Sequence, residues 1–172
     1  MANKEALRDL QHRLAERLQE ARSTSRGQTW LAVECGGRGF LFPLKEAGEI
    51  FPMTALAPVS HAHPWFLGVA NLRGHLHGVV ELAAFFGIKP VAASRDQAML
   101  VAFNSSLDVN AALLVDRLAG LRGEEQLFPD GDAPAGSPFF VGRRLRDVDR
   151  RVWQEISLAR LVRHEAFLKI VG

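Results

Sequence analysis

The stretch GVANLRGHLHGVVEL, residues 68–82, decides how the fold of this chain is interpreted. Two short apolar runs flank ArgGlyHis, and a glycine at a bend between two extended runs predicts a β-hairpin. The bend also gathers one arginine and two histidines. It is therefore the first place to look for a functional site.

The same pattern recurs later in the chain. ProTrpPheLeuGly at 64–68 is matched by ProPhePheValGly at 138–142, an offset of 74 residues that also places Glu81 on Glu155. Two copies with so long a period favour two similar small β units over a solenoid, and neither unit alone would bury much surface. The sequence therefore predicts a mainly all-β fold whose two units share an interface.

Other segments fit this interpretation. TWLAVE and GFLFPL, which flank CysGlyGlyArg, predict a hairpin over residues 29–44, and AMLVAF and NAALLV predict two more strands. Residues 45–50 read as a short helical turn, and residues 123–138, with three glycines and three prolines, read as a loop. We expect aromatic side chains at matched positions of the two copies to anchor the cores or the seam: Trp65 and Phe66, and Phe139 and Phe140.

The N-terminal segment predicts an amphipathic helix. Leucines at positions 7, 10, 14 and 18, followed by Ala21, recur at steps of three and four residues, and SerThrSerArgGly at 23–27 ends the pattern. We expect the leucine stripe to pack on the body of the protein. Docking of another chain on the stripe is the alternative.

Composition excludes several classes of protein. The 172 residues are 48% hydrophobic and carry a formal net charge of only +2, too small for a nucleic-acid-scale field. The single cysteine, Cys35, cannot form an intramolecular disulfide, so no oxidising compartment is required. Residues 50–72 carry no charge but are broken by three prolines, which argues against membrane insertion. We expect a cytoplasmic protein.

The usual catalytic signatures are absent, which favours a non-enzyme without a cofactor. Two alternatives stay open. The pairs His61/His63 and His75/His77 could bind a transition metal, or belong to an enzyme that uses one, because residues two apart on a strand share a face. The five arginines of residues 143–151 could bind nucleic acid, although no aromatic residue interleaves with them.

GlyValAlaAsnLeuArgGly at 68–74, followed by an apolar strand that ends in Glu81, resembles the hallmark of the CheW family of chemotaxis coupling proteins. LeuLeuValAspArgLeuAlaGlyLeu at 113–121 is similar to the second copy of the family pattern, and the resemblance covers about residues 28–163. The N-terminal helix and AlaAlaPhePheGly at 83–87 look most similar to the PilI branch, which serves the chemotaxis-like system that controls type IV pili and twitching motility.

The resemblance implies two five-stranded, SH3-like β-barrels, roughly residues 28–92 and 93–163, with strand exchange possible. Residues 1–27 would form the N-terminal helix and linker, and residues 164–172 a C-terminal tail. It implies a non-enzymatic adaptor that links the cytoplasmic tip of a methyl-accepting chemoreceptor to the regulatory domain of a CheA-type histidine kinase, with no nucleic acid among its partners.

The resemblance also implies a partner-binding site at Glu49, Gly68, Asn71, Leu72, Arg73 and Gly74. Asn71 would support the turn and Gly74 would supply a left-handed backbone conformation. The planar guanidinium of Arg73 would either contact an acidic partner residue or brace the turn internally, and lysine could not copy its geometry.

Overall fold

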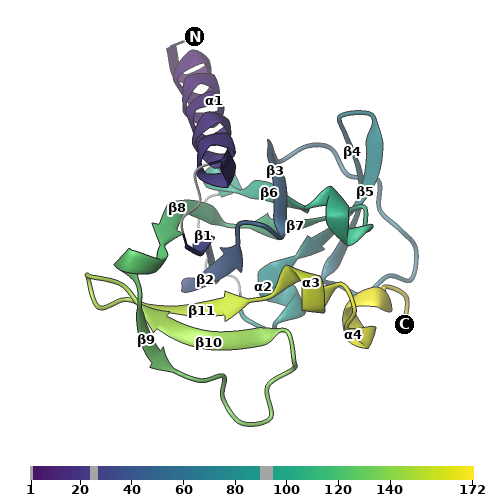
Figure 1. Cartoon of the computed structure of the whole chain (residues 1–172). Coiled ribbons are helices and arrows are strands. Elements are labelled where there is room, and N and C mark those ends of the chain that lie inside the picture. The colour runs from purple at the N-terminus through teal and green to yellow at the C-terminus, as the bar shows by residue number, and fades with distance from the viewer. Residues whose placement is uncertain (1, 24–26, 90–94) are drawn as a thin grey trace.

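The computed structural model describes residues 2–23, 27–89 and 95–172 (Figure 1). It consists mostly of strands in two sheets, with one long N-terminal helix and a few short helices. The all-β prediction and the N-terminal helix are therefore confirmed. The SH3-like form of each barrel stays a prediction.

The larger sheet has six strands: β1 Thr29–Cys35, β2 Arg38–Pro43, β8 Arg117–Gly123, β9 Phe128–Gly131, β10 Val141–Arg146 and β11 Val152–Ile156. Their spatial order is β8-β1-β2-β11-β10-β9. The predicted first hairpin forms β1 and β2. The prediction of a loop over residues 123–138 is wrong in part, because β9 lies within it and pairs with β10.

The smaller sheet has five strands: β3 Ala47–Pro52, β4 Phe66–Leu72, β5 His75–Glu81, β6 Met99–Phe103 and β7 Ala111–Val115. Their spatial order is β3-β6-β7-β5-β4. The predicted helical turn at 45–50 is wrong. The amide of Glu46 donates to the carbonyl of Pro43 (2.9 Å) in a reverse turn, and the residues that follow pair with β6, because an available strand edge outweighs local helix propensity.

The chain crosses from the larger to the smaller sheet after β2 and returns after β7. β3 follows β2 in the chain but pairs with β6, and β8 follows β7 but pairs with β1. Each sheet therefore contains strands from both halves of the chain. The predicted division into residues 28–92 and 93–163 stays a prediction, and its boundary falls outside the described residues.

Backbone hydrogen bonds define how the two copies correspond. The amide of Glu81 donates to the carbonyl of Trp65 (2.8 Å), and the amide of Ser157 donates to the carbonyl of Phe140 (2.9 Å). Glu81 therefore corresponds to Ser157, and the predicted match of Glu81 with Glu155 is wrong. One residue of this shift arises before the hairpin, where Trp65 matches Phe140, and one arises within it, because the second hairpin has the longer connection between its strands.

This correspondence also explains the aromatic residues. Phe140 is 3% exposed and lies in the core, and Trp65 and Phe66 pack against that core half-buried. Phe139 is 51% exposed, so its predicted anchoring role is wrong. Because Trp65 matches Phe140 in the structure, Phe139 matches Pro64, one position before the first aromatic residue that packs in the core.

The core has three parts. One shared cluster joins apolar side chains of both sheets, such as Val33 of β1 and Val101 of β6. A second cluster lies within the smaller sheet around Leu100, and a third lies within the larger sheet around Trp30 and Trp153. Alternate residues of a central strand thus point into the shared cluster and into the cluster of their own sheet, which explains the continuous apolar runs in the sequence.

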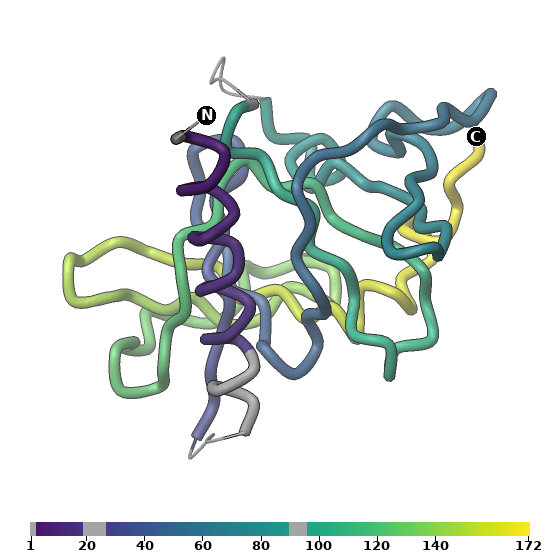
Figure 2. The backbone as a smooth tube through the Cα atoms, turned by 90° about the horizontal axis from the view of Figure 1, so that it is seen from above, coloured from purple at the N-terminus to yellow at the C-terminus, as the bar shows by residue number. Residues whose placement is uncertain are grey.

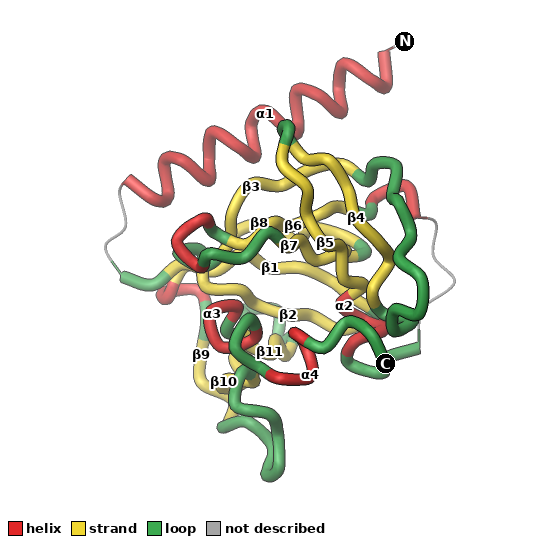
Figure 3. The backbone as a smooth tube through the Cα atoms, turned by 90° about the vertical axis from the view of Figure 1, so that its right-hand side faces the viewer, coloured by secondary structure: helices red, strands yellow, loops and turns green. Residues whose placement is uncertain are grey.

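The helix α1 (Ala2–Ser23) lies beside the strands, with its N-terminal end projecting away from them (Figures 1 and 3). Seen from above, α1 and the C-terminus lie on opposite sides of the molecule (Figure 2). The short helices are α2 Leu82–Phe85, α3 Leu158–Leu161 and α4 Glu165–Leu168, with 3-10 turns at Arg95–Gln97, Ser105–Leu107 and Glu124–Gln126. Within the described ranges, every helix is too short or too polar to cross a membrane.

Candidate partner-binding site

The tip of the β4–β5 hairpin is a two-residue turn. Leu72 pairs with His75, so Arg73 and Gly74 alone connect the strands. Both have positive φ angles, 52° for Arg73 and 81° for Gly74, the combination that matches the twist of a tight hairpin. Asn71 Oδ1 accepts a hydrogen bond from the Gly74 amide (2.8 Å), as predicted for its supporting role.

The backbone conformation of Arg73 was not foreseen. A non-glycine residue in the left-handed region costs roughly 1 kcal/mol, and asparagine or glycine would occupy this position at lower cost. Arg150 at the β10–β11 tip adopts the same conformation (φ 65°), so the feature particular to Arg73 is the contact of its side chain with Glu49. Backbone strain of this kind clusters at functional sites.

The Arg73 side chain reaches Glu49 of β3. Arg73 Nη2 lies 2.7 Å from Glu49 Oε1, and the two side chains are 73% and 43% exposed. Glu49 lies in a β-bulge, since Ala47 pairs with Phe103 but Ile50 pairs with Val101. The extra residue re-aims the strand locally and turns Glu49 toward the hairpin tip. Two predicted site residues that are 24 positions apart thus meet.

Such an exposed ion pair contributes little to stability, typically between 0 and about 1 kcal/mol. It therefore costs little to open or to share with a charged group on another molecule. The pair offers a bidentate guanidinium and a carboxylate side by side on an accessible surface.

Two of the predicted site residues lie beneath this surface. Leu72 is 3% exposed and belongs to the core of the smaller sheet. Gly68 is buried with φ 135°, and a Cβ there would lie 2.3 Å from the carbonyl oxygen of Ala57. Its missing side chain allows Ala57 and Val69 to exchange two hydrogen bonds of 2.8 Å, which tie the chain after β3 to β4. Gly68 and Leu72 shape the site, and Glu49, Asn71, Arg73 and Gly74 form its surface.

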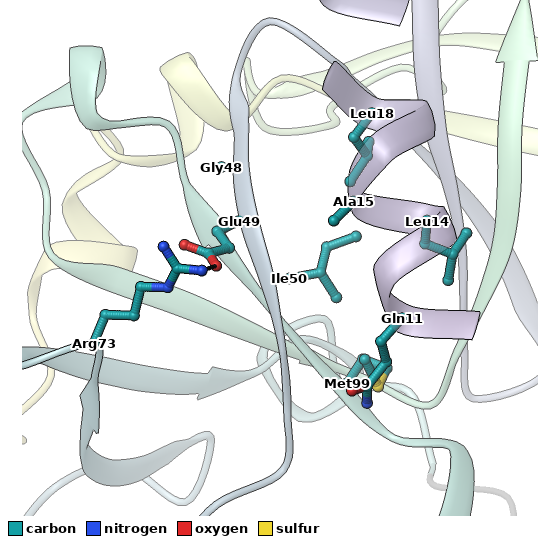
Figure 4. Close-up of a pocket in the computed structure, with 9 residues that line it drawn as sticks. All are labelled: Gln11, Leu14, Ala15, Leu18, Gly48, Glu49, Ile50, Arg73 and Met99. Atoms are coloured by element: carbon teal, nitrogen blue, oxygen red, sulfur yellow. Dashed lines mark ion pairs between the residues drawn. The ribbon is translucent and has the colours of Figure 1, made fainter. Parts of the chain in front are cut away.

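A groove of about 320 Å³ lies between α1 and the edge of β3 (Figure 4). Ile50 points toward the helix, and the neighbouring Glu49 points the other way, toward Arg73 (Figure 4). The sequence did not predict this groove. The only signal for it was the long leucine stripe of the N-terminal segment. Its apolar lining consists of Leu14, Ala15, Leu18, Ile50 and Met99.

The histidine pairs do not assemble a ligand set. Across residues 2–23, 27–89 and 95–172, no three His, Cys, Asp or Glu side chains gather closely enough to hold a metal ion. His77 Nδ1 lies 3.1 Å from the carbonyl oxygen of His75 in its own strand. His75 and His77 alternate along β5, whereas His61 and His63 lie in the loop before β4.

Several arginines of the 143–151 cluster have partners within the protein. Arg151 pairs with Glu34 and lies over the Trp153 ring at 4.4 Å. Arg146 Nη2 lies 2.9 Å from Asp130 Oδ1 of β9. These arginines hold the larger sheet together, which leaves a weaker basis for nucleic-acid binding.

Glu34 is the centre of that network. The hydrogen bond from Arg117 Nε (2.7 Å), together with the Arg151 contact, lowers the pKa of Glu34 to about 2 against the opposing effect of burial. A carboxylate paired this firmly serves structure and is not available as a proton donor at neutral pH. Cys35 beside it is buried, and burial raises the pKa of its thiol to about 12, so it is inert.

The model of the CheW-like domain matches residues 29–166. The chain belongs to the CheW-like family. The protein PilI of Pseudomonas aeruginosa is 31% identical over 151 residues, which cover 83% of this chain and 81% of PilI. The chemotaxis protein CheW of Rhizobium meliloti is 31% identical over 98 residues, or 57% of this chain and 62% of that protein.

A solved structure gives the same answer for the fold. The scaffolding protein TtCheW from Thermoanaerobacter tengcongensis superposes with a TM-score of 0.63 over 77% of this chain and 90% of its own, at 18% identity. The matched segment of the family model begins at β1 and ends within α4. Helix α1 precedes it, so the groove combines a CheW-like strand edge with an element outside the family model.

Proposed function

We propose that this protein is a non-enzymatic adaptor that couples a methyl-accepting chemoreceptor to a CheA-type histidine kinase. Membership of the CheW-like family supports the adaptor role, since CheW-like proteins act as scaffolds between these two partners. The similarity to PilI favours a chemosensory pathway that controls type IV pili and twitching motility. The cytoplasmic tip of the receptor and the regulatory domain of the kinase would both lie in the cytoplasm.

One observation carries the site assignment. An arginine occupies a left-handed position at a hairpin tip, exposes most of its side chain and meets Glu49 at 2.7 Å. Asparagine would adopt this backbone conformation at a lower energetic cost, so the turn itself does not favour arginine. Recognition of a partner through the guanidinium explains why arginine is there.

The two alternatives have weaker support. Metal binding would need the two histidine pairs to meet a third ligand, and the described residues provide no such group. Nucleic-acid binding would need arginines that are free to contact phosphates, whereas Arg146 and Arg151 are paired with carboxylates.

Substitution of Arg73 tests the proposal. Arg73→Ala should weaken binding to one of the two partners by roughly 30-fold, about 2 kcal/mol, the scale of an arginine at the centre of an interface. Arg73→Lys keeps the charge without the planar fork and should behave like alanine where bidentate geometry matters. Titration calorimetry with a receptor-tip fragment and with the kinase regulatory domain measures both.

Wild-type protein that binds neither fragment would contradict the adaptor function. Wild-type affinity of Arg73→Ala for both fragments would contradict the site only. A pull-down from native lysate that recovers a receptor or a kinase would provide independent support.

A further inference from the structure

The N-terminal half of α1 presents an apolar stripe that the described part of the protein leaves exposed. Leu18 is 8% exposed and belongs to the shared core, and Leu14 is half-buried at the groove. Leu7 and Leu10 are 52% and 56% exposed. The expectation that the stripe packs on the body therefore holds at Leu14 and Leu18, whereas Leu7 and Leu10 stay exposed.

The stripe leads directly into the candidate site. The same groove is lined by Leu14 and Leu18 on one side and by Glu49, Ile50 and Arg73 on the other. A helix laid along Leu7 and Leu10 would enter this groove and end beside the Arg73–Glu49 pair. The free stripe and the candidate site form one continuous surface, which we call the α1–β3 surface.

Charge on α1 is segregated about this stripe. At 100° per residue, Lys4, Arg13 and Arg17 lie on the flanks of the leucines. The acidic residues Glu5, Asp9 and Glu16 lie on the opposite face, where His12 Nε2 lies 3.9 Å from Glu16 Oε1. The stripe therefore complements a helix whose own apolar stripe is flanked by acidic residues.

A second copy of the chain is a poorer occupant. Two such helices would bring basic flanks to face one another, which disfavours pairing. The exposed part of the stripe consists of two leucines and part of a third. The area that these side chains offer is far smaller than the roughly 800 Å² per partner that a stable dimer buries. A partner helix that also fills the groove beside β3 gains the area that a homodimer lacks.

We propose that the α1–β3 surface binds a helix of the chemoreceptor tip, with acidic residues beside its apolar stripe, so that α1 supplies half of the receptor site. This inference rests on the proposed adaptor function and deepens it. Ridges of the receptor helix pack between the leucines of α1, and one of the acidic residues beside its apolar stripe meets Arg73.

Substitutions on the free half of α1 test the proposal. Leu7→Gln with Leu10→Gln should lower the affinity for a receptor-tip fragment at least tenfold and leave the affinity for the kinase regulatory domain and the melting temperature unchanged, because both leucines are exposed. Val148→Gln is the matched control, since Val148 is 73% exposed on the β10–β11 tip, away from α1. It should bind the receptor tip as wild type does.

Charge reversal tests the chemistry of the partner. Lys4→Glu with Arg13→Glu should weaken receptor binding and reduce its salt dependence. Arg150→Glu with Arg163→Glu makes the same change in net charge at exposed positions elsewhere and should have no effect. Equal weakening by both pairs would show that only net charge matters and would overturn the acidic-helix assignment.

The outcomes separate the two proposals. Wild-type receptor affinity in the leucine variant, with reduced affinity in Arg73→Ala, would overturn the role of α1 and leave the adaptor function standing. No binding of either fragment by wild-type protein would overturn both. A dimer in sedimentation that the leucine variant abolishes would assign the stripe to a second copy and overturn the proposal.

Discussion

The two copies of the chain each contain a hairpin with a charged tip, and the two tips use their charges differently. At β4–β5, Arg73 is 73% exposed and meets a carboxylate that is itself 43% exposed. At β10–β11, the carboxylate of Asp147 is buried and accepts hydrogen bonds from Trp153 Nε1 and from the amides of Asp149 and Arg151. The first tip presents its charge to solvent, as the proposed recognition role requires, whereas the second encloses the Asp147 carboxylate, which holds that hairpin together.

The largest expected effect lies at the enclosed tip. Asp147→Ala would leave the Trp153 indole and two backbone amides without an acceptor, and we expect a loss of about 3 kcal/mol in the free energy of unfolding. Asp147→Asn keeps one carbonyl oxygen and should lose less. Urea denaturation measures both, and an unchanged midpoint for the alanine variant would show that the buried carboxylate does not hold this hairpin.

A smaller loss is expected beneath the presenting tip. Gly68→Ala places a Cβ 2.3 Å from the Ala57 carbonyl oxygen at φ 135°, and we expect it to cost about 2 kcal/mol. Gly74→Ala is the matched control, since φ there is 81° but no atom lies within 4 Å of the added Cβ. Equal destabilisation by the two variants would mean that backbone strain dominates and that the contact with Ala57 is unimportant.

The sequence predicted that the two hairpins are equivalent, but it did not predict which residues of the two copies match. The recurrence of ProTrpPheLeuGly at 64–68 as ProPhePheValGly at 138–142 identifies two copies. Backbone hydrogen bonds ahead of each hairpin, from Phe66 to His63 and from Val141 to Pro138, already shift the match by one residue, so that Trp65, and not Phe66, corresponds to Phe140. Phe139 and Phe140 lie in the turn before β10, where Phe140 enters the core and Phe139 stays exposed, so a shift of one residue decides which ring is buried.

The site was predictable only in part. The resemblance to the family pattern identified Glu49 and Arg73, and the structure brings them together. Pattern alone could not show that Leu72 is buried, that β3 pairs with β6, or that the middle of α1 lines the groove beside Ile50. These features depend on contacts between segments that are distant in sequence, which local propensity does not encode.

The pH dependence of stability sharpens the comparison further. The pKa of Glu34 is lowered from 4.5 to about 2 by its hydrogen bonds to Arg117 and Arg151. Its contribution is therefore present above about pH 5 and is lost as pH falls toward 2. Because both arginines are partly exposed, we expect about 1–2 kcal/mol from this group. Glu34→Gln should flatten the acid limb of the stability curve, and an unchanged limb would contradict the assignment.

The smallest expected change in stability concerns the presenting tip itself, and it tests the central claim most directly. Melting temperature and affinity for the receptor-tip fragment are to be measured together for Arg73→Asn and Arg151→Ala. Asparagine relieves the left-handed strain at φ 52° while removing the guanidinium. We predict that Arg73→Asn melts no lower than wild type but binds at least tenfold more weakly, whereas Arg151→Ala melts lower and binds as wild type. A lowered melting temperature for Arg73→Asn with unchanged affinity would contradict the account.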